Sequence, residues 1–296
     1  MPPLSAEQLT AKYMGVLAHV HTRLSNFPIH IESNLTVGWL VRTLQAAGLA
    51  GSAGAPLNYV LLTEHVSNPA RPKSLGHYSP RLKSLVKQSR PGDERGVTLL
   101  YGYEVSMLPT GGIDLPRELL DSRPVVIASR HRLPTASEKD PDSIMRLFAQ
   151  ACSNPHIRVL GHPTRNIEDV QGVDWARVFD EAAKSGTAIE INFNIFPDPE
   201  KELARFAYWQ DWLHKLGKSK AQVFMGNDLH TRKQVKRLIA GWAKSRARPG
   251  RGDIVTCLQS VSAAGISSGR VVTANPLKLQ RWAAIDKSAA VAVSSG

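Results

Sequence analysis

Residues 15–22 read GVLAHVHT, and this stretch decides the fold. A short apolar run, typical of a buried strand, ends directly in two histidines, His19 and His21, which stand two positions apart. Side chains at positions i and i+2 of an extended chain point to the same side, so both imidazoles can face one site. The stretch therefore predicts a buried strand whose carboxyl end carries two candidate metal ligands.

The same arrangement recurs along the chain, because short apolar runs alternate with longer segments of helical periodicity. The predicted strands are residues 15–19, 59–63, 98–101, 125–128, 158–160, 188–192 and 222–225. The predicted helices are residues 37–47, 143–151, 175–184, 200–216 and 233–243. Asp174 is a typical N-cap for the third of these helices, and Gly186 is a typical stop. Such alternation is typical of an α/β protein with a parallel sheet or barrel.

Six of the ten histidines come just after a predicted strand: His19, His21, His65, His131, His162 and His230. Two acids, Glu104 and Asp228, occupy the same kind of position. In a parallel barrel the carboxyl ends of all strands meet at one mouth, where active sites lie. A lone histidine after a strand is more often a loop residue than a ligand, but six of them with two acids are hard to explain in that way. Imidazole and carboxylate ligands suit zinc, manganese or iron.

Composition limits the class of protein. The chain has 296 residues, enough for one large core, and a net charge of +12, which favours phosphate-bearing or nucleic-acid partners. Its two cysteines form no CxxC pair, so a cysteine zinc site is not expected. No signal peptide and no apolar stretch of membrane-spanning length are found, so we expect a cytoplasmic protein without a membrane partner.

The motifs HVHT, TEH, YGYEVS, the histidine after VVIAS, GHPT, EIN and GNDLH occur in this order between about residues 16 and 230. Together they resemble the PHP (polymerase and histidinol phosphatase) family. Residues 111–131, GGIDLPRELLDSRPVVIASRH, look most like stand-alone PHP phosphoesterases and the PHP domain of family X DNA polymerases. The resemblance implies a distorted seven-stranded (βα) TIM-like barrel with a metal site at the carboxyl ends of the strands. Residues 1–296 would form a single domain, in which residues 246–296 are a helical extension that closes the barrel.

The resemblance also implies which residues hold two or three divalent ions. One ion would be held by His19, His21, Glu104 and Asp228, a second by Glu104, His131 and His162 with Glu104 bridging, and a third by His65 and His230. Two positions depart from the family pattern. Glu64 replaces the usual Asp before the histidine of the second motif, and its longer arm would act on ligand orientation. Asn26 occupies an acidic position after HVHT, for which His30 or Glu32 is a possible substitute.

The predicted activity is that of a metal-dependent phosphoesterase, an enzyme that hydrolyses phosphoric ester bonds by a metal-activated hydroxide. In the absence of a third metal, His230 or His65 would protonate the leaving oxygen. Arg23 and Arg165 follow HVHT and GHPT, and they are the favoured clamps for the substrate phosphate.

Two alternatives stay open. The first is a nuclease or 3′-end processing enzyme acting on DNA or RNA. The net charge and the basic residues within 232–251 favour it, although such a run is usually a solvated face. The second is a non-catalytic metal-binding PHP module, for which Asn26 and Glu64 are the only support. The metal, the natural substrate and the oligomeric state do not follow from the sequence.

Overall fold

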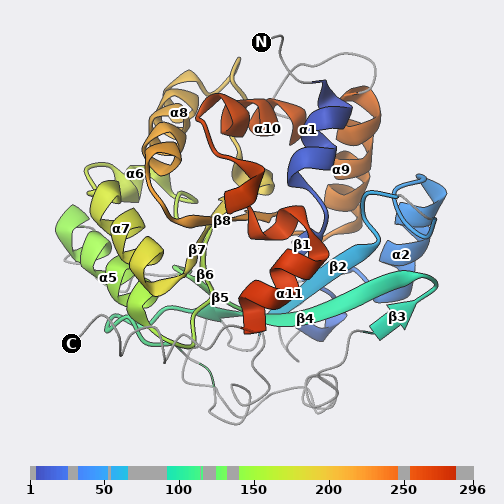
Figure 1. Cartoon of the computed structure of the whole chain (residues 1–296), viewed down its shortest axis with the longest axis horizontal. Helices are drawn as coiled ribbons and strands as arrows, with labels where there is room; N and C mark the ends of the chain where they lie inside the picture. Colours follow the sequence, from blue (N-terminus) through green and yellow to red (C-terminus); the bar gives the residue numbers. More distant parts are fainter. Residues whose placement is uncertain are drawn as a thin grey trace.

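The structure, a computed structural model, describes residues 5–25, 33–52, 55–65, 92–113, 115, 125–131, 140–245 and 254–284. At its centre seven parallel strands form one sheet in the order β1-β2-β4-β5-β6-β7-β8, with helices packed outside it (Figure 1). These strands are β1 (Leu17–Val20), β2 (Tyr59–His65), β4 (Val97–Ser106), β5 (Val125–Ser129), β6 (Val159–Gly161), β7 (Ala188–Asn192) and β8 (Gln222–Gly226). All seven predicted strands are present, with boundaries that shift by a few residues.

The first and last strands of the sheet meet and close it into a barrel. The Asn227 amide donates to the Ala18 carbonyl over 3.0 Å. Beyond it, the His21 amide donates to the Leu229 carbonyl over 2.9 Å, and the Leu229 amide donates to the His19 carbonyl over 3.1 Å. The predicted α/β fold, a distorted seven-stranded TIM-like barrel, is confirmed. The hydrogen bonds that close the barrel lie around the histidine pair of the first motif.

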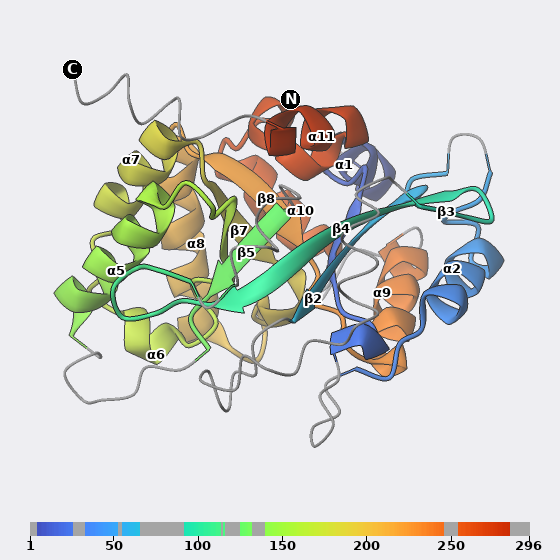
Figure 2. The same ribbon diagram turned by 90° about the horizontal axis from the view of Figure 1, so that it is seen from below.

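A short strand that the sequence analysis did not predict, β3 (Gly92–Glu94), pairs antiparallel with β4. Arg95 and Gly96 join the two strands with φ values of 56° and 79°, as a two-residue hairpin turn requires. The hairpin reaches toward α2 (Val37–Ala46) at the edge of the barrel (Figure 2), and Gln45 of that helix donates to the Arg95 carbonyl over 2.9 Å. A strand of three residues is too short to show a periodic pattern in the sequence.

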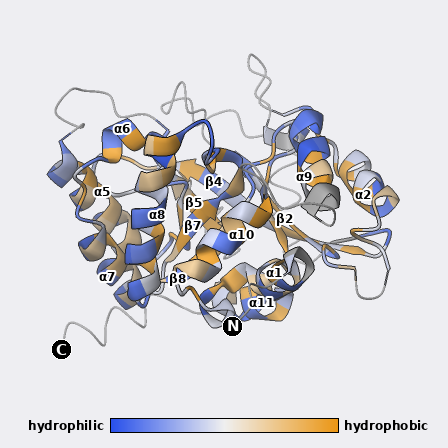
Figure 3. Ribbon diagram, turned by 90° about the horizontal axis from the view of Figure 1, so that it is seen from above, coloured by the Kyte–Doolittle hydropathy of each residue, from blue (hydrophilic) through white to orange (hydrophobic). Residues whose placement is uncertain are grey.

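The other helices are α1 (Ala6–Tyr13), α5 (Pro141–Ser153), α6 (Ile167–Val170), α7 (Trp175–Ser185), α8 (Leu203–Lys218), α9 (Arg232–Ser245), α10 (Ile254–Ala263) and α11 (Pro276–Ala284). The five predicted helices are α2, α5, α7, α8 and α9. The Asp174 side chain caps α7 by accepting from the Arg177 amide, and Gly186 ends the helix with a φ of 69°. Figure 3 shows that the helices turn apolar faces toward the sheet and polar faces outward. No helix within the described ranges is long and apolar enough to cross a membrane.

The interior of the barrel is filled by apolar side chains from alternate strand positions: Val16, Ala18, Leu61, Val125, Ile127, Val159, Ala188 and Phe224. Leu279 and Trp282 of α11 join this cluster from the N-terminal ends of the strands. The Trp282 indole also donates to the Gly186 carbonyl, just before β7, over 3.2 Å. Helix α11 therefore covers the end of the barrel opposite the carboxyl ends. Residues 246–253 and 285–296 of the predicted extension lie outside the described residues.

Candidate metal centre

The carboxyl ends of the strands bring together all eight residues that the sequence predicts as ligands. Seven of them, all except His162, have candidate ligand atoms in three groups, within each of which the atoms lie within 4.8 Å of one another. The groups are His19, His21, Glu104 and Asp228; His65, Glu104 and His131; and His21, His65 and His230. The first group matches the first implied metal site. In the second, His65 takes the place expected for His162, whose Nε2 nonetheless lies 2.8 Å from Glu104 Oε1.

Glu104 lies between the groups and has a different set of histidines at each oxygen. Its Oε2 is 3.3 Å from the Nε2 atoms of His19, His21 and His65. Its Oε1 is 3.3 Å from His131 Nε2 and accepts a 2.5 Å hydrogen bond from Ser129 Oγ. This geometry suits a carboxylate that bridges two ions, the role that the resemblance implies for Glu104.

The backbone is unusual at three of these residues, one inside β1 and two just after the ends of β6 and β8. His19, His162 and Asp228 have φ values of 59°, 23° and 48°. Non-glycine residues rarely adopt the left-handed region, and such strain concentrates at functional sites. In β1 the left-handed backbone changes the direction of the His19 side chain. Ala18 faces the barrel interior, so strict alternation along the strand would turn His19 outward. The register shift between Leu17 and Val20 turns His19 inward instead, beside His21.

Glu190 of β7 is a buried carboxylate that contacts two residues of the cluster. It is not among the residues that the sequence analysis singled out. Its Oε1 lies 2.5 Å from His19 Nδ1, and its Oε2 accepts a 2.5 Å hydrogen bond from the His162 amide. The strand reads AIEIN, and a charged residue in the middle of an apolar buried strand needs a partner. The glutamate in this apolar strand could therefore have been found from the sequence, in which EIN was used only as one of the motifs that resemble the family.

The pKa values of four histidines in the cluster are strongly shifted. Burial lowers the pKa of His19, but the negative charges of Glu190 and Glu104 outweigh it and raise the pKa well above 6.5. Burial also opposes protonation of His21, but the carboxylates of Asp228 and Glu104 beside its ring outweigh burial and raise its pKa to about 9. Burial and the charge of His21 lower the pKa of His65 well below 6.5 and that of His230 to about 4.

The two carboxyl groups of the cluster behave in the opposite way to an isolated buried acid. Burial alone would raise their pKa values. The charge of His19 and those of the neighbouring histidines outweigh burial and hold the pKa of Glu104 well below its ordinary value. The neighbouring His21 imidazole and the charge of His19 do the same for Asp228. Both acids are therefore ionised at neutral pH, the state in which a carboxylate binds a cation.

Buried atoms without hydrogen-bond partners show that this donor set fits a divalent cation. His19 Nε2, His21 Nε2, Glu104 Oε2 and Asp228 Oδ1 are all buried and have no hydrogen-bond partner. Leaving such an atom unpaired costs about 1–3 kcal/mol, so four of them converging on one point call for an explanation. Nitrogen and carboxylate oxygen donors are the ligands that zinc, manganese and iron accept.

Comparison with known proteins agrees with this site. No family model matches the chain. A probable phosphatase of Caldanaerobacter subterraneus is 33% identical over 107 residues, which cover 36% of this chain and 41% of that protein. A probable phosphatase of Caldicellulosiruptor saccharolyticus is 27% identical over 228 residues, covering 76% of this chain and 84% of that protein. The DNA polymerase/3′-5′ exonuclease PolX of Bacillus subtilis is 28% identical over 147 residues, covering 46% of this chain and 24% of that protein.

The resemblance to the PHP family is confirmed. The chain spans less than half the length of the first of these relatives. Glu64, the departure from the PHP pattern, belongs to none of the three ligand groups. It accepts hydrogen bonds from the Thr22 amide over 2.9 Å, from Thr22 Oγ1 over 2.6 Å and from Ser25 Oγ over 2.5 Å. Glu64 therefore anchors the turn after β1, which carries His21. Asn26, which occupies the acidic position of the PHP pattern, and its possible substitutes His30 and Glu32 lie outside the described residues.

The arginines near the PHP motifs lie in different settings. Arg165 Nη1 is 4.0 Å from Asp228 Oδ2, and its side chain is 48% exposed, so it lies at the rim of the cluster. Arg23 is exposed in the short helix η1 (Arg23–Ser25). Arg130 is held by Asp169, with Nη2 3.1 Å from its Oδ2. Of these three, Arg165 lies beside a residue of the ligand groups.

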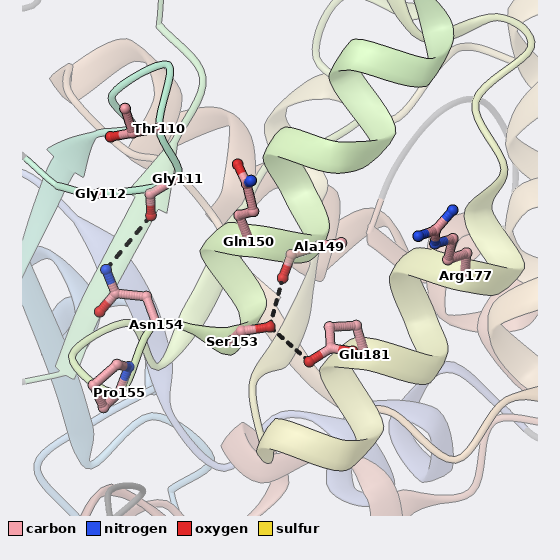
Figure 4. Close-up of a pocket in the computed structure, with 10 residues that line it drawn as sticks. All are labelled: Thr110, Gly111, Gly112, Ala149, Gln150, Ser153, Asn154, Pro155, Arg177 and Glu181. Atoms are coloured by element: carbon pink, nitrogen blue, oxygen red, sulfur yellow. Dashed lines mark hydrogen bonds between the residues drawn. The ribbon is translucent and has the colours of Figure 1, made fainter. Parts of the chain in front are cut away.

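A cavity of about 520 Å³ lies elsewhere, between α5, α7 and the turn at residues 110–112 (Figure 4). Its lining shares no residue with the three ligand groups. Ser153 Oγ on its wall donates to Glu181 Oε1 over 2.6 Å and to the Ala149 carbonyl over 3.0 Å. The bond to Glu181 joins α5 to α7, so the hollow is a seam between two helices.

Proposed function

We propose that this chain is a metal-dependent phosphoesterase that hydrolyses phosphate esters. One observation carries the proposal: the four buried ligand atoms of His19, His21, Glu104 and Asp228 lie within 4.8 Å of one another and lack hydrogen-bond partners. The relatives named probable phosphatases support the choice of reaction. Phosphoryl transfer also suits such a site, since its catalysis is mainly positioning and charge stabilisation.

The proposed cofactors are two or three divalent ions of zinc, manganese or iron, held by the three ligand groups, with His162 as a further ligand beside Glu104. Such ions, when bound, polarise the phosphoryl oxygens and lower the pKa of water. Glu104 and Asp228 contribute the negative charge that holds the ions. His65 and His230 are neutral at pH 7 because their pKa values are lowered, and a neutral imidazole has the lone pair that ligation requires.

The proposed phosphate clamp is Arg165, with Arg23 as a second contributor. The Arg165 guanidinium lies at the rim of the cluster beside Asp228 and keeps nearly half of its surface in solvent. A guanidinium binds two phosphate oxygens at once, so it would orient the ester with its phosphorus toward the ligand groups. Proton donation to the leaving oxygen by His230 or His65 stays a prediction. Their lowered pKa values count against it, and unchanged turnover in His230→Ala would rule it out for His230.

The test of the proposal is hydrolysis of p-nitrophenyl phosphate and of its bis-ester by protein loaded in turn with manganese, zinc or iron. A His19→Ala/Asp228→Ala variant is the control, because it removes two of the four donors of the first group. Metal-dependent turnover that is lost in the control is the expected result. If no metal supports turnover although metals bind tightly, the chain is a non-catalytic PHP module.

A second candidate, a nuclease or 3′-end processing enzyme, is favoured by the surface of α9. This helix begins two residues after His230 and exposes Arg232, Lys233, Lys236 and Arg237. The Arg232 guanidinium lies over the ring of Trp39, 5.1 Å from its centroid, so an aromatic surface lies beside the charges. Phosphate backbones bind such faces. Residues 246–251 of the basic run lie outside the described residues.

Salt dependence separates this candidate from a small-ester phosphatase. If α9 binds a nucleic-acid backbone, Lys236→Ala/Arg237→Ala will weaken binding of single-stranded DNA and reduce the slope of log K against log salt concentration by roughly 1.4. Hydrolysis of p-nitrophenyl phosphate by the same variant will stay at the wild-type rate. DNA binding that is unaffected by the double substitution would remove the support for this candidate.

A further inference from the structure

We propose that Glu190 is a positioning residue for the metal ligands: one buried carboxylate fixes the His19 ring and the His162 backbone together, and Gly226 leaves the space through which it reaches His19. This inference rests on the proposed metal-dependent function. It assigns a role to a residue that is not itself in any of the three ligand groups.

The contact with His19 determines which ring nitrogen faces the site. Glu190 Oε1 lies 2.5 Å from His19 Nδ1, and an ionised carboxylate can only accept, so Nδ1 carries the proton. His19 Nε2 then points at Glu104 Oε2 over 3.3 Å and at Asp228 Oδ1 over 3.7 Å. A carboxylate behind a ligating histidine fixes the tautomer and raises the basicity of the ligand.

The other oxygen of Glu190 holds a second strand end. The His162 amide donates to Glu190 Oε2 over 2.5 Å, while His162 Nε2 lies 2.8 Å from Glu104 Oε1. His19 and His162 both have left-handed backbone, a conformation that persists only where the surroundings impose it. Glu190 contacts both of them, and so it links the sides of the cluster contributed by β1 and β6.

Gly226 is required by the position of this carboxylate. Strand β8 lies between β7, which carries Glu190, and β1, which carries His19. A Cβ atom built on Gly226 would lie 1.8 Å from Glu190 Oε1 and 2.7 Å from its Cδ. The φ of Gly226 is not in the left-handed region, so the glycine is needed for space and not for its backbone conformation.

The competing explanation is that Glu190 only stabilises the fold as the partner of a buried histidine. The two roles differ in what they affect. A structural carboxylate changes the stability of the metal-free protein, whereas a positioning residue changes metal affinity beyond any change in stability. Zinc affinity of the full chain, measured by competition with a chromophoric chelator, and the melting temperature of the metal-free protein separate them.

The variants are Glu190→Gln, Gly226→Ala and, as control, Thr187→Val. Glu190→Gln removes the charge and keeps the shape, and Gly226→Ala displaces the carboxylate without altering it. Thr187 lies directly before β7, is buried, donates to the Cys152 carbonyl over 2.7 Å and belongs to none of the three ligand groups. Both test variants are expected to bind zinc roughly 10–100-fold more weakly. The double variant should bind no more weakly than Glu190→Gln, since both changes act on one contact. Thr187→Val should melt at a lower temperature with wild-type affinity.

Wild-type zinc affinity in Glu190→Gln, or an equal loss in Thr187→Val, would overturn the inference. Should neither test variant fold, the nitrogen chemical shifts of His19 in the zinc-loaded wild type decide, because the inference requires a protonated Nδ1 and a zinc-bound Nε2. The reverse assignment overturns it, as does a wild type that binds no zinc. A wild type that binds zinc but hydrolyses no ester with zinc, manganese or iron would refute the proposed function and leave the role of Glu190 standing.

Discussion

The two ends of this barrel are built from the same strands and differ in almost every physical respect. At the N-terminal end Leu279 and Trp282 of α11 pack on apolar side chains, and Trp282 is 7% exposed. At the carboxyl end the equally buried His19, Glu104 and Asp228 are polar, and two of them have left-handed backbone. The first end contributes burial of apolar surface. The second keeps strained backbone and unpaired polar atoms, each of which costs on the order of 1–3 kcal/mol.

This difference indicates that the N-terminal ends of the strands stabilise the fold, whereas their carboxyl ends bind the metal. Changes at the N-terminal end should alter the free energy of unfolding and leave metal binding intact. Changes at the carboxyl end should alter metal binding and turnover. The comparison fails if either kind of change affects both properties equally.

The largest effect is expected for Glu104→Gln. Glu104 faces five histidines and lies in two ligand groups, so neutralising it removes the charge that both groups share. We expect metal-dependent turnover of p-nitrophenyl phosphate to fall roughly 10³-fold or more, since loss of metal-based charge stabilisation costs several kcal/mol. Steady-state kinetics at saturating manganese will check this. Glu181→Gln on α7, remote from the ligand groups, should retain wild-type turnover, and equal losses in both would contradict the assignment.

The next effect belongs to the opposite end. Trp282→Ala removes the largest side chain of α11 from the closed end of the barrel, along with its hydrogen bond to Gly186. The free energy of unfolding, from urea denaturation, should fall by about 3–5 kcal/mol. Zinc affinity of the folded variant should stay within a few-fold of wild type. Leu277→Ala on the same helix is the control, because Leu277 is 60% exposed and should contribute little. A comparable loss of zinc affinity would show that the two ends are not independent.

A third prediction concerns pH, where the metal-free and metal-loaded proteins should diverge. In the metal-free protein the pKa of His21 is raised from 6.5 to about 9. Its stabilisation is therefore fully present below pH 6.5 and is lost as pH rises through about 9. The pKa of His230 is lowered from 6.5 to about 4, so its contribution is present above pH 6.5 and is lost as pH falls through about 4. These two histidines make the metal-free protein most stable near pH 6.5.

Above pH 6.5 the affinity for zinc should rise with pH, whereas the stability of the metal-free protein falls. Zinc must displace the proton from His21 before it can bind there, so apparent affinity should rise toward pH 9, by up to about tenfold per pH unit for each proton released. Melting temperatures measured with zinc and with chelator from pH 6 to 9 should therefore move apart as pH rises. Parallel curves would show that His21 loses no proton on zinc binding.

Much of the fold could be predicted because the deciding signals are local. Alternating apolar runs identified all seven parallel strands, and Asp174 and Gly186 identified the ends of α7. The capping box of Ser5 and Gln8 that begins α1 is an equally local signal, although α1 is not among the predicted helices. Strand β3 is too short to have a period, and the position of α11 beneath the barrel depends on contacts between residues far apart in the sequence.

The candidate site divides in a similar way. Histidines placed directly after strands could be found from the sequence, because parallel strands bring their carboxyl ends to one mouth. The sequence could not predict which ligand atoms face each other within the cluster. His65 joins Glu104 and His131 in the second group because of side-chain direction, which spacing does not report. The inward turn of His19 depends on its left-handed backbone, and the residue types around a histidine do not predict that conformation.

The smallest effect is expected at Glu64, where this chain departs from the PHP pattern. Its carboxylate reaches the Thr22 amide, Thr22 Oγ1 and Ser25 Oγ at once, and Ser25 Oγ in turn accepts from the His65 amide over 3.0 Å. Aspartate, the usual residue of the family, is one methylene shorter and should lose one of these bonds. Glu64→Asp should then lower stability by about 1–2 kcal/mol and weaken zinc binding by less than about tenfold.

Glu64→Gln separates the charge of this side chain from its length. Glutamine keeps the reach of glutamate, but its amide nitrogen cannot accept from Thr22 or Ser25, so one donor of the turn after β1 is left unpaired. We therefore expect Glu64→Gln to destabilise the protein more than Glu64→Asp, as measured by urea denaturation of the metal-free forms. The reverse order would mean that the turn depends on the length of the arm and not on its charge, and that the glutamate at this position compensates for a wider gap between β1 and β2.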